Sequence, residues 1–503
     1  MVFSRYISMM LNGLIILTIT ALLYRVFIVS YRIWIHPLRR YRGPKIWAAS
    51  RLPYAYHSFN GTINYQLERL HNKYGPVVRI TPNELSYTNA EAWDDIYTRS
   101  PHGKAPLKKS RNFAEPENGV RGLLTAPDEK SHGRMRRVLS PGFSEKAVRD
   151  QEPIISIYFD QLMQRLKENC GKPVDMQKWF SFFAFDVIGD LTFGESFKAL
   201  ETSKEHPWIS TFTNDQRTNV LMALSFRFTP LDQILLKLIP ESMREKQRAH
   251  KAFGVAGLRE RLSYKKPRQD FLVNVQKTID TPQGFSMAEM EDTIPILVIA
   301  GAETTSTALA GAVYYLATNP AAYKKLTAEI RGAFKSEEEI NMVSVNNLSY
   351  ELAVLNETLR ILPPAPSTLP RITPREGSMI CGHFVPGNTI VGVNYWSAFH
   401  SPSNFRDPYR FVPERWLTPE QDEMAERYQN DQKKVAQPFS VGPRNCLGRV
   451  LAYAEMKVVL ARLIWNFDLQ LREEPQAWST SMKHWIIYAK LPLWMDLKPV
   501  VRE

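Results

Sequence analysis

One cysteine near the C-terminus lies in a segment whose residue types suit metal chemistry. The segment Phe439-Ser-Val-Gly442-Pro-Arg444-Asn-Cys446-Leu-Gly448 directly precedes a stretch with helical periodicity. A cysteine at the start of a helix lies where the helix dipole and free backbone N–H groups favour the thiolate. A single cysteine cannot complete a tetrahedral zinc site, but it can be the only protein ligand of a heme iron. The segment therefore predicts Cys446 as an axial thiolate ligand.

The other residues of this segment fit the same interpretation. Gly442 and Gly448 permit a tight loop and a close approach of the backbone to a flat ligand. Phe439 supplies an aromatic wall near the sulfur, and Arg444 offers a fixed cation to a carboxylate. The alternative for an isolated cysteine is a buried structural residue in a glycine-rich loop.

A long helix is predicted over residues 286–318. It opens on a capping box, Ser286 with Glu289, and Asn319-Pro320 ends it. Residues 294–302 are apolar almost all round, so the helix should cross the interior of the domain. Pro295 predicts a kink or the loss of a backbone hydrogen bond.

Two further helices bring charged residues onto one face. Glu357 and Arg360 are three apart on a predicted helix over 348–361, so they can pair. If the pair is buried it needs further partners to offset desolvation, whereas an exposed pair is common and weak. His132 and Arg136 are four apart on a predicted helix and face the same way.

Four segments, in this order along the chain, resemble motifs of the cytochrome P450 superfamily. Residues 300–305 (AGAETT) resemble its oxygen-binding motif, 357–360 (ETLR) its E-x-x-R motif and 411–416 (FVPERW) its P-E-R-W motif. Residues 439–448 match its heme-binding signature F-x-x-G-x-R-x-C-x-G. The resemblance extends over residues 40–500. Within the superfamily it is closest to fungal secondary-metabolism members such as the isotrichodermin hydroxylases.

The resemblance implies a catalytic role for the middle of the long helix. Gly301 would leave room for dioxygen beside the heme iron, Thr304 would hydrogen-bond that dioxygen, and Glu303 would feed protons to it. The residues also allow plainer alternatives. The Thr304 hydroxyl can bond back to an earlier carbonyl, and Glu303 can form a helix-stabilising ion pair.

The resemblance also implies residues that hold the cofactor. Arg415 would join Glu357 and Arg360 in a structural triad that supports the cysteine loop, serving folding and heme retention rather than the chemical step. The cations for the two propionates of heme b would be His132, Arg136, Arg371 and Arg444. At the first of these positions many relatives have tryptophan, and an ordinary surface histidine is the alternative there.

The N-terminal residues predict a membrane anchor. From residue 7 to 29 the only charge is Arg25, and a helix of this length can cross a bilayer. No A-x-A site follows, which argues against a cleaved signal peptide. The basic residues after the helix predict a cytosolic C-terminal part. We therefore expect a lumenal tail (1–6), a transmembrane anchor (7–29), a basic linker (30–50) made non-helical by Pro37 and Pro44, and a heme-thiolate monooxygenase domain (51–503).

Composition narrows the function further. The formal net charge of +13 is scattered rather than clustered, which excludes a nucleic-acid binder and favours an acidic partner protein or anionic lipid. The only other cysteines are Cys170 and Cys381; this count argues against a disulfide framework and fits a reducing compartment. With a cytosolic domain, the glycosylation sequons at Asn60, Asn347 and Asn356 would stay unused.

The expected fold is mainly α: the P450 fold, an α-rich prism with a small β lobe that includes a hairpin at 77–88 and short strands at 379–395. The resemblance implies NADPH- and O2-dependent monooxygenation of a lipophilic small molecule at the endoplasmic reticulum membrane. Electrons would come from NADPH–cytochrome P450 reductase or cytochrome b5. Two alternatives stay open: a heme-thiolate isomerase or peroxide-rearranging enzyme on the same fold, and a non-catalytic heme-binding receptor or scaffold.

Overall fold

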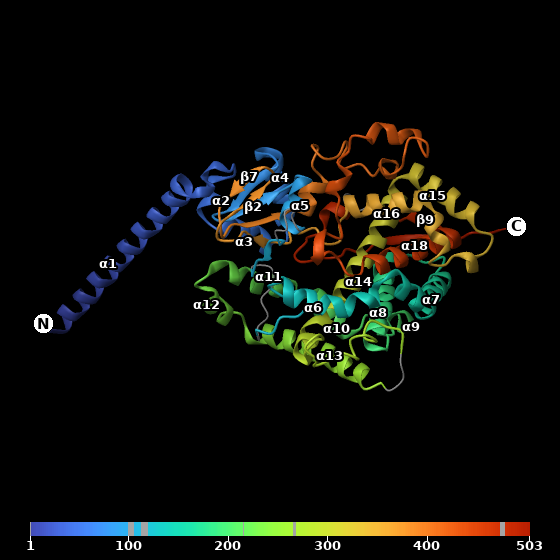
Figure 1. Ribbon diagram of the computed structural model, residues 1–503, viewed down its shortest axis with the longest axis horizontal. Helices are drawn as coiled ribbons and strands as arrows, with labels where there is room; N and C mark the ends of the chain where they lie inside the picture. Colours follow the sequence, from blue (N-terminus) through green and yellow to red (C-terminus); the bar gives the residue numbers. More distant parts are fainter. Residues whose placement is uncertain are drawn as a thin grey trace.

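The computed structural model describes residues 2–98, 105–111, 119–214, 216–264, 268–472 and 478–502. Helices dominate this part of the chain, and the long N-terminal helix projects away from the rest (Figure 1). The α-helices are α1 (Val2–Ser30), α2 (Lys45–Ala49), α3 (Leu52–Phe59), α4 (Ile63–Tyr74), α5 (Glu91–Tyr97), α6 (Glu129–Leu139), α7 (Glu145–Glu168), α8 (Met176–Phe193), α9 (Ala199–Thr202), α10 (Pro207–Asn214), α11 (Gln216–Ser225), α12 (Asp232–Lys237), α13 (Glu241–Leu262), α14 (Met287–Thr318), α15 (Pro320–Ala333), α16 (Ser349–Ile361), α17 (Tyr395–Phe399), α18 (Arg449–Asn466) and α19 (Trp478–Ser481).

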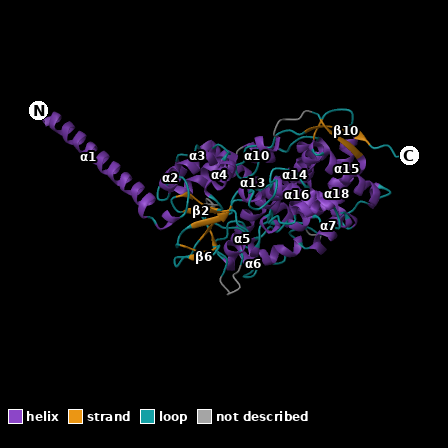
Figure 2. Cartoon of the chain, turned by 90° about the horizontal axis from the view of Figure 1, so that it is seen from above, coloured by secondary structure: helices purple, strands orange, loops and turns teal. Residues whose placement is uncertain are grey.

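The strands form three small sheets. A five-stranded sheet has the order β1-β2-β8-β5-β3, a three-stranded sheet the order β4-β10-β9, and β6 pairs with β7. The first sheet lies beside the base of α1, whereas β10 lies near the C-terminus at the other end of the molecule (Figure 2). The strands are β1 (Val77–Thr81), β2 (Glu84–Tyr87), β3 (Lys108–Lys109), β4 (Val174–Asp175), β5 (Arg371–Ile372), β6 (Ser378–Ile380), β7 (His383–Val385), β8 (Ile390–Val393), β9 (Phe467–Leu471) and β10 (Trp494–Pro499).

The expected hairpin and the strands around Pro386 are confirmed. β1 and β2 pair antiparallel, with Val77 opposite Tyr87. β6, β7 and β8 all fall within residues 378–393. The β structure is divided between two ends of the molecule, because β9 and β10 follow the last long helix rather than joining the N-terminal lobe.

Helix α14 crosses the interior, as its sequence predicts. Ser286 caps it, and the reciprocal bonds between Ser286 and Glu289 form the expected capping box. The helix continues through Pro295, whose missing N–H leaves one carbonyl without its helical donor. It packs against α8, α13, α16 and α18, and its middle belongs to the main hydrophobic core.

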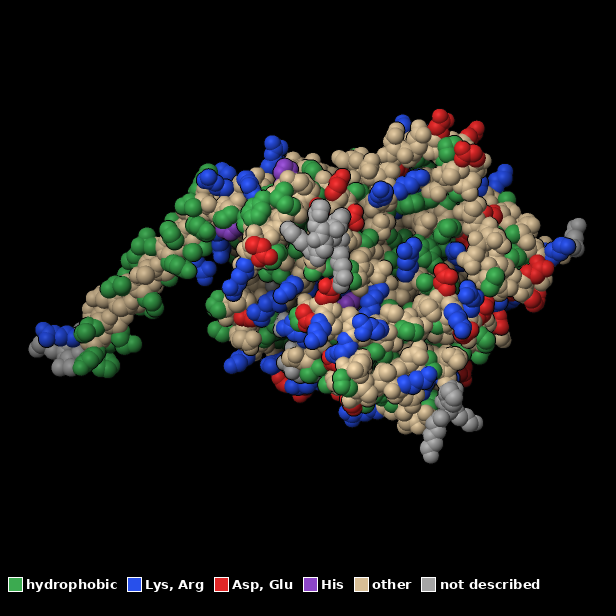
Figure 3. Space-filling model, viewed as in Figure 1, with side chains coloured by type: hydrophobic (Ala, Val, Ile, Leu, Met, Phe, Trp, Pro, Cys, Tyr) green, Lys and Arg blue, Asp and Glu red, His purple; other side chains and the backbone are tan. Residues whose placement is uncertain are grey.

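Helix α1 is long and apolar enough to span a membrane, with mean hydropathy 2.1 over its most apolar window and no part of that window buried. Figure 3 shows hydrophobic side chains along this helix, while Lys and Arg are interspersed with Asp and Glu over the visible globular face. The same length and composition test is met by α14, but most of that helix is buried.

The expectation of a non-helical linker over 30–50 is wrong. A π-helical turn (Tyr31–Ile35) continues α1, a 3₁₀ turn begins at Pro37, and Pro44 is the N-cap of α2. Proline is tolerated at these places, because the first residues of a helix have no intrahelical acceptor for their N–H groups.

Buried Arg79 of β1 fixes the base of α1. Its Nη1 donates to the carbonyl of Arg32 at 2.9 Å, and its Nη2 donates to Pro82 at 2.7 Å. The Arg32 guanidinium in turn donates to the carbonyl of Ala49 at 2.8 Å. The N-terminal helix is therefore bonded to the sheet lobe at its base.

Candidate active site

The loop before α18 has a tightly determined backbone. Gly442 adopts φ +77°, and a Cβ there would lie 2.1 Å from the carbonyl oxygen of Tyr97, so no other residue fits. The Cys446 N–H donates to the Phe439 carbonyl at 2.8 Å and closes the loop. The Phe439 ring lies 5.3 Å from the Tyr453 ring of α18. These contacts fix where Cys446 presents its sulfur.

Cys446 is an exposed residue, although many protein atoms surround its thiol at longer range. Burial raises the pKa of the thiol, and the Gly448 N–H and the charge of Arg136 oppose that rise. The N–H at the start of α18 thus favours the thiolate, and a bound metal cation would stabilise it further. Gly448 caps α18, and a Cβ there would meet no atom within 4 Å, which leaves space for a close ligand.

Two arginines join this loop to the region of α6. Arg444 donates to the carbonyls of Ala126 and Asp128 at 2.8 and 2.9 Å. Arg136 donates to the carbonyl and the side chain of Asn445 at 2.7 and 2.5 Å. Both guanidiniums are thus held in place by neutral acceptors, so much of their charge remains for an anion.

Buried Arg371 and half-buried Lys109 add basic side chains to the same place. They lie directly opposite one another in the antiparallel pair β3–β5, an arrangement that is destabilising unless an anion separates the charges. The Arg371 side chain is buried, and its Nε has no hydrogen-bond partner. Burial and the charges of Arg371 and Arg444 lower the pKa of Lys109 well below its ordinary value.

His132 lies within the same cluster. Burial and the charges of Arg444, Arg136, Lys109 and Arg371 lower its pKa to about 3. It is therefore neutral at physiological pH and buried, not an ordinary surface histidine. Among the described residues, Arg136, Arg371 and Arg444 form no ion pair with a carboxylate, so the cluster has the composition of a dianion site.

The sequence interpretation missed Lys109. It stands in a two-residue strand that carries no recognisable motif. Only the pairing of β3 with β5 brings it to Arg371. The four residues named from the sequence do come together, and this lysine joins them.

These features fit a heme with an axial thiolate. An exposed cysteine, a glycine without neighbours at its Cβ position and a cluster of partly buried basic side chains suit an iron, a flat ring and two carboxylates respectively. Among the described residues no cluster of three His, Cys, Asp or Glu could bind a metal ion by itself.

In α14 the predicted site residues Gly301, Glu303 and Thr304 each contact another part of the protein. A Cβ on Gly301 would lie 2.6 Å from Cδ1 of Ile188 in α8, so its small size allows these helices to pack. The Thr304 hydroxyl donates back to the Ala300 carbonyl at 2.6 Å. Glu303 is buried and lies 2.8 Å from the Lys490 ammonium. The structure therefore contains both plainer alternatives, a back-bonded Thr304 and an ion-paired Glu303. The roles of these residues in oxygen binding and proton supply stay predictions.

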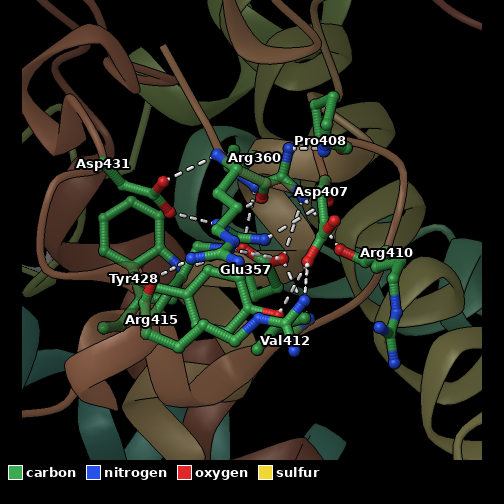
Figure 4. A network of polar contacts seen from close by, with 12 residues as sticks. Glu357, Arg360, Asp407, Pro408, Arg410, Val412, Arg415, Tyr428 and Asp431 are labelled. Carbon is green, nitrogen blue, oxygen red and sulfur yellow. Dashed lines mark hydrogen bonds and ion pairs between the residues drawn. The ribbon is translucent and has the colours of Figure 1, made fainter. Parts of the chain in front are cut away.

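The structure brings Glu357, Arg360 and Arg415 together with fully buried side chains (Figure 4). Arg360 donates to the Glu357 carboxylate at 2.8 and 2.9 Å, and Arg415 at 3.0 Å. Burial alone would raise the pKa of Glu357, but the two cations outweigh it and hold that pKa below its ordinary value. Asp431, which no sequence pattern indicated, forms a further ion pair with Arg415.

Comparison with known proteins agrees with this site. The family model described as Cytochrome P450 matches residues 44–493. The chain is 40% identical over 493 residues to cytochrome P450 monooxygenase astA from Talaromyces wortmannii, covering 98% of each chain. It is 41% identical over 504 residues to averantin hydroxylase from Dothistroma septosporum, covering 98% of this chain and 94% of that one. It is also 40% identical over 508 residues to cytochrome P450 monooxygenase atr2 from Stereocaulon alpinum, covering 99% and 98%.

These relatives are monooxygenases, and their similarity extends over the whole described catalytic part. The function expected from the sequence is therefore confirmed: the chain is a heme-thiolate monooxygenase that needs a redox partner and a small-molecule substrate. The fold expectation is confirmed as well. With its accessible cysteine, its cation cluster and its buried triad, the chain belongs to the cytochrome P450 family.

Proposed function

We propose that this chain oxidises a lipophilic small molecule of fungal secondary metabolism, with Cys446 as the axial ligand of the heme. The observation that carries the proposal is the partly buried cluster of basic side chains beside the loop of Cys446. When bound, a heme with a thiolate ligand supplies the activation of dioxygen. Support for the substrate class comes from relatives such as averantin hydroxylase.

The chain's own residues would bind the heme and set its orientation. Arg136, Arg371 and Arg444, with Lys109 and His132, would hold the two propionates. Their fixed positions, set by bonds to backbone carbonyls, would orient the ring against α14. In α14 the Thr304 hydroxyl would hold a proton at its Oγ1, and Glu303 would replenish it from the protein side. Both groups lie in a largely buried helix, where proton supply depends on side chains rather than bulk water.

We further propose where the protein lies in the cell and which proteins donate electrons to it. With α1 in the bilayer, the basic residues that follow it favour a cytosolic catalytic domain, at the endoplasmic reticulum membrane. Lys434 and Arg449 are exposed on either side of the Cys446 loop in the sequence. This positive charge fits docking of an acidic electron donor, NADPH–cytochrome P450 reductase or cytochrome b5.

The ligand assignment is tested by the spectrum of the reduced, CO-bound protein. The wild type should absorb at the long-wavelength Soret position of thiolate-ligated heme, and Cys446→Ala should lose that band. Cys170→Ala and Cys381→Ala are matched controls and should keep it. A band that survives Cys446→Ala would refute the assignment.

The reaction class is tested by the role of Thr304. Thr304→Ala should still bind heme and consume NADPH, but release more hydrogen peroxide per NADPH, because the hydroxyl no longer controls proton delivery. Thr304→Ser, which keeps the hydroxyl, is the control. Unchanged coupling in a well-folded Thr304→Ala enzyme would support the plainer alternative, a back-bonded helix residue. A product that forms without NADPH would indicate an isomerase instead.

A further inference from the structure

A loop before α6 carries the backbone groups that hold several basic side chains of the cofactor site. Within residues 122–128, two carbonyls accept hydrogen bonds from Arg444 at 2.8 and 2.9 Å, and a third accepts one from Lys109. The loop then leads directly into α6, the helix of His132 and Arg136. The position of the 122–128 loop therefore affects most of the basic side chains of this site.

The beginning of this loop is bonded to α14. The Gly122 N–H donates to Asp292 Oδ2 at 2.9 Å, and the Leu123 N–H donates to Thr293 Oγ1 at 3.0 Å. The Thr125 hydroxyl donates to the same Asp292 oxygen at 3.3 Å. Gly122 and Asp292 are buried, and a buried N–H group outside a helix or sheet needs an acceptor, since an unpaired one costs free energy. Two adjacent side chains of α14 thus fix the backbone of the loop.

The contact between this loop and α14 is close enough to require glycine. A Cβ at Gly122 would lie 2.4 Å from Thr293 Oγ1 and 2.9 Å from Asp292 Oδ2. Any larger residue would therefore push both acceptors out of place. The loop turns tightly after this point, because the Ala126 N–H donates to the Gly122 carbonyl at 2.9 Å. A displacement at Gly122 would consequently move Ala126, whose own carbonyl accepts from Arg444.

The two oxygens of the Asp292 side chain have different partners. Oδ2 accepts from the loop, whereas Oδ1 lies 3.6 Å from the Lys251 side-chain nitrogen in α13, and that lysine side chain is 40% exposed. An ion pair at this distance with a partly exposed lysine contributes little to stability. A backbone N–H group, in contrast, needs an oxygen acceptor whether or not that oxygen is charged. The bond to the loop and the charge of Asp292 can therefore be changed separately.

We propose that Asp292 is a positioning residue for the cofactor: its Oδ2 fixes this loop, and the loop in turn fixes the carbonyls that hold Arg444 and Lys109. This rests on the proposed function, in which these basic side chains bind the heme propionates. Without the Asp292 acceptor, the loop would become ordered only when heme binds. The cost of that ordering would lower the affinity for heme, and the basic side chains would lie less close to the propionates.

The test uses the full-length, heme-loaded enzyme. Three quantities are measured: amide hydrogen exchange in the peptide that covers residues 122–126, the rate of heme transfer to excess apomyoglobin, and the reduction potential. In Asp292→Ala, exchange should be faster and heme transfer should accelerate on the order of 10-fold, the scale of one or two buried hydrogen bonds. The reduction potential should fall, because positive charge near the ring favours the reduced, more negative heme. Asp292→Asn keeps an acceptor oxygen and should restore all three values.

Lys251→Met is the matched control, since it removes the charged partner of Asp292 but not the acceptor, and it should match the wild type. Three results would overturn the proposal: wild-type exchange or heme transfer in Asp292→Ala, failure of asparagine to restore the values, or an effect of Lys251→Met equal to that of Asp292→Ala. If Asp292→Ala does not fold, Gly122→Ala disturbs the same contact from the loop side. It should give the same three changes, and their absence there would equally overturn the proposal.

Arg444→Met separates failure of this proposal from failure of the proposed function. Unchanged heme transfer and reduction potential in Arg444→Met would refute the role of the basic side chains in heme binding. If Arg444→Met loses heme faster, while Asp292→Ala shows faster exchange but wild-type heme transfer, only the role of Asp292 is refuted. Heme content and the CO spectrum show that each variant has folded.

Discussion

Replacing Glu357 with glutamine should weaken heme retention severely without changing turnover per heme. The carboxylate accepts five hydrogen bonds: two from Arg360, one from Arg415, one from the N–H of Val412 and one from the Trp416 indole. Its side chain and both guanidiniums are fully buried. The neutral amide would leave these two cations without the charge that now compensates them.

The size of the effect follows from this geometry. Breaking a buried ion pair by removing one partner costs about 3–5 kcal/mol. Asp431 still pairs with Arg415, so the lower end applies here. A loss of about 3 kcal/mol shifts the unfolding equilibrium more than about 100-fold. Because large heme proteins often unfold irreversibly, the rate of heme loss in moderate urea is the suitable measurement, and it should rise on the order of 10- to 100-fold.

The chain offers a matched control. Arg165 and Glu168 form a pair of the same types at the same spacing, at 2.8 Å, but on an exposed helix face. Glu168→Gln should leave heme loss unchanged, because water already screens this pair. Equal rates for the two variants would refute the importance of burial. A fall in activity per retained heme in Glu357→Gln would refute the assignment of the triad to folding.

Three further outcomes are expected. Arg371→Met should lower heme affinity more than Lys434→Met, measured by heme titration of the apoprotein, because the first removes a buried cation and the second an exposed one. Glu455→Gln should make the free energy of unfolding fall less steeply as the pH rises. Burial raises the pKa of Glu455 to about 8, so the protonated side chain stabilises the fold at low pH. In the wild type that contribution is lost as the pH rises from about 4.3 toward 8. Urea unfolding at pH 5.5 and 8 measures this change, at most about 1.4 kcal/mol per pH unit, and an unchanged slope would refute it. Deleting residues 2–30 should release part of the protein from membranes with its heme retained, measured by sedimentation and the CO spectrum, whereas loss of heme would show that α1 supports the core.

Much of the site could be predicted because its residues are close together in the sequence. The spacing of Glu357 and Arg360, the capping box at Ser286 and the loop ending at Cys446 are all local patterns with direct physical meaning. The convergence of the propionate cations was expected from the family resemblance. Composition and periodicity alone would not have brought Arg371 and His132 together.

The contacts that the sequence did not predict depend on packing between residues far apart in the chain. Lys109 and Lys490 are ordinary lysines in the sequence, and they become notable only where β3 pairs with β5 and where the C-terminal segment meets α14. Asp431 meets Arg415 through the loop fold. The linker prediction failed for a different reason: Pro37 and Pro44 were taken to end helices, although proline also starts them.

The hydrogen bonds that join the base of α1 to Arg79 have a mechanical consequence. A flexible linker would let a membrane helix change its tilt without moving the catalytic domain. Here the π-helical turn and the hydrogen bonds from Arg79 and Arg32 would transmit such a change to the domain. Transmembrane helices tilt to match their hydrophobic length to bilayer thickness. With α1 in a bilayer, thickening or thinning the lipid would therefore rotate the whole catalytic domain like a lever arm, and so alter how its surface meets the headgroups. Lipid composition would in this way act on access of apolar compounds to the enzyme without touching the heme.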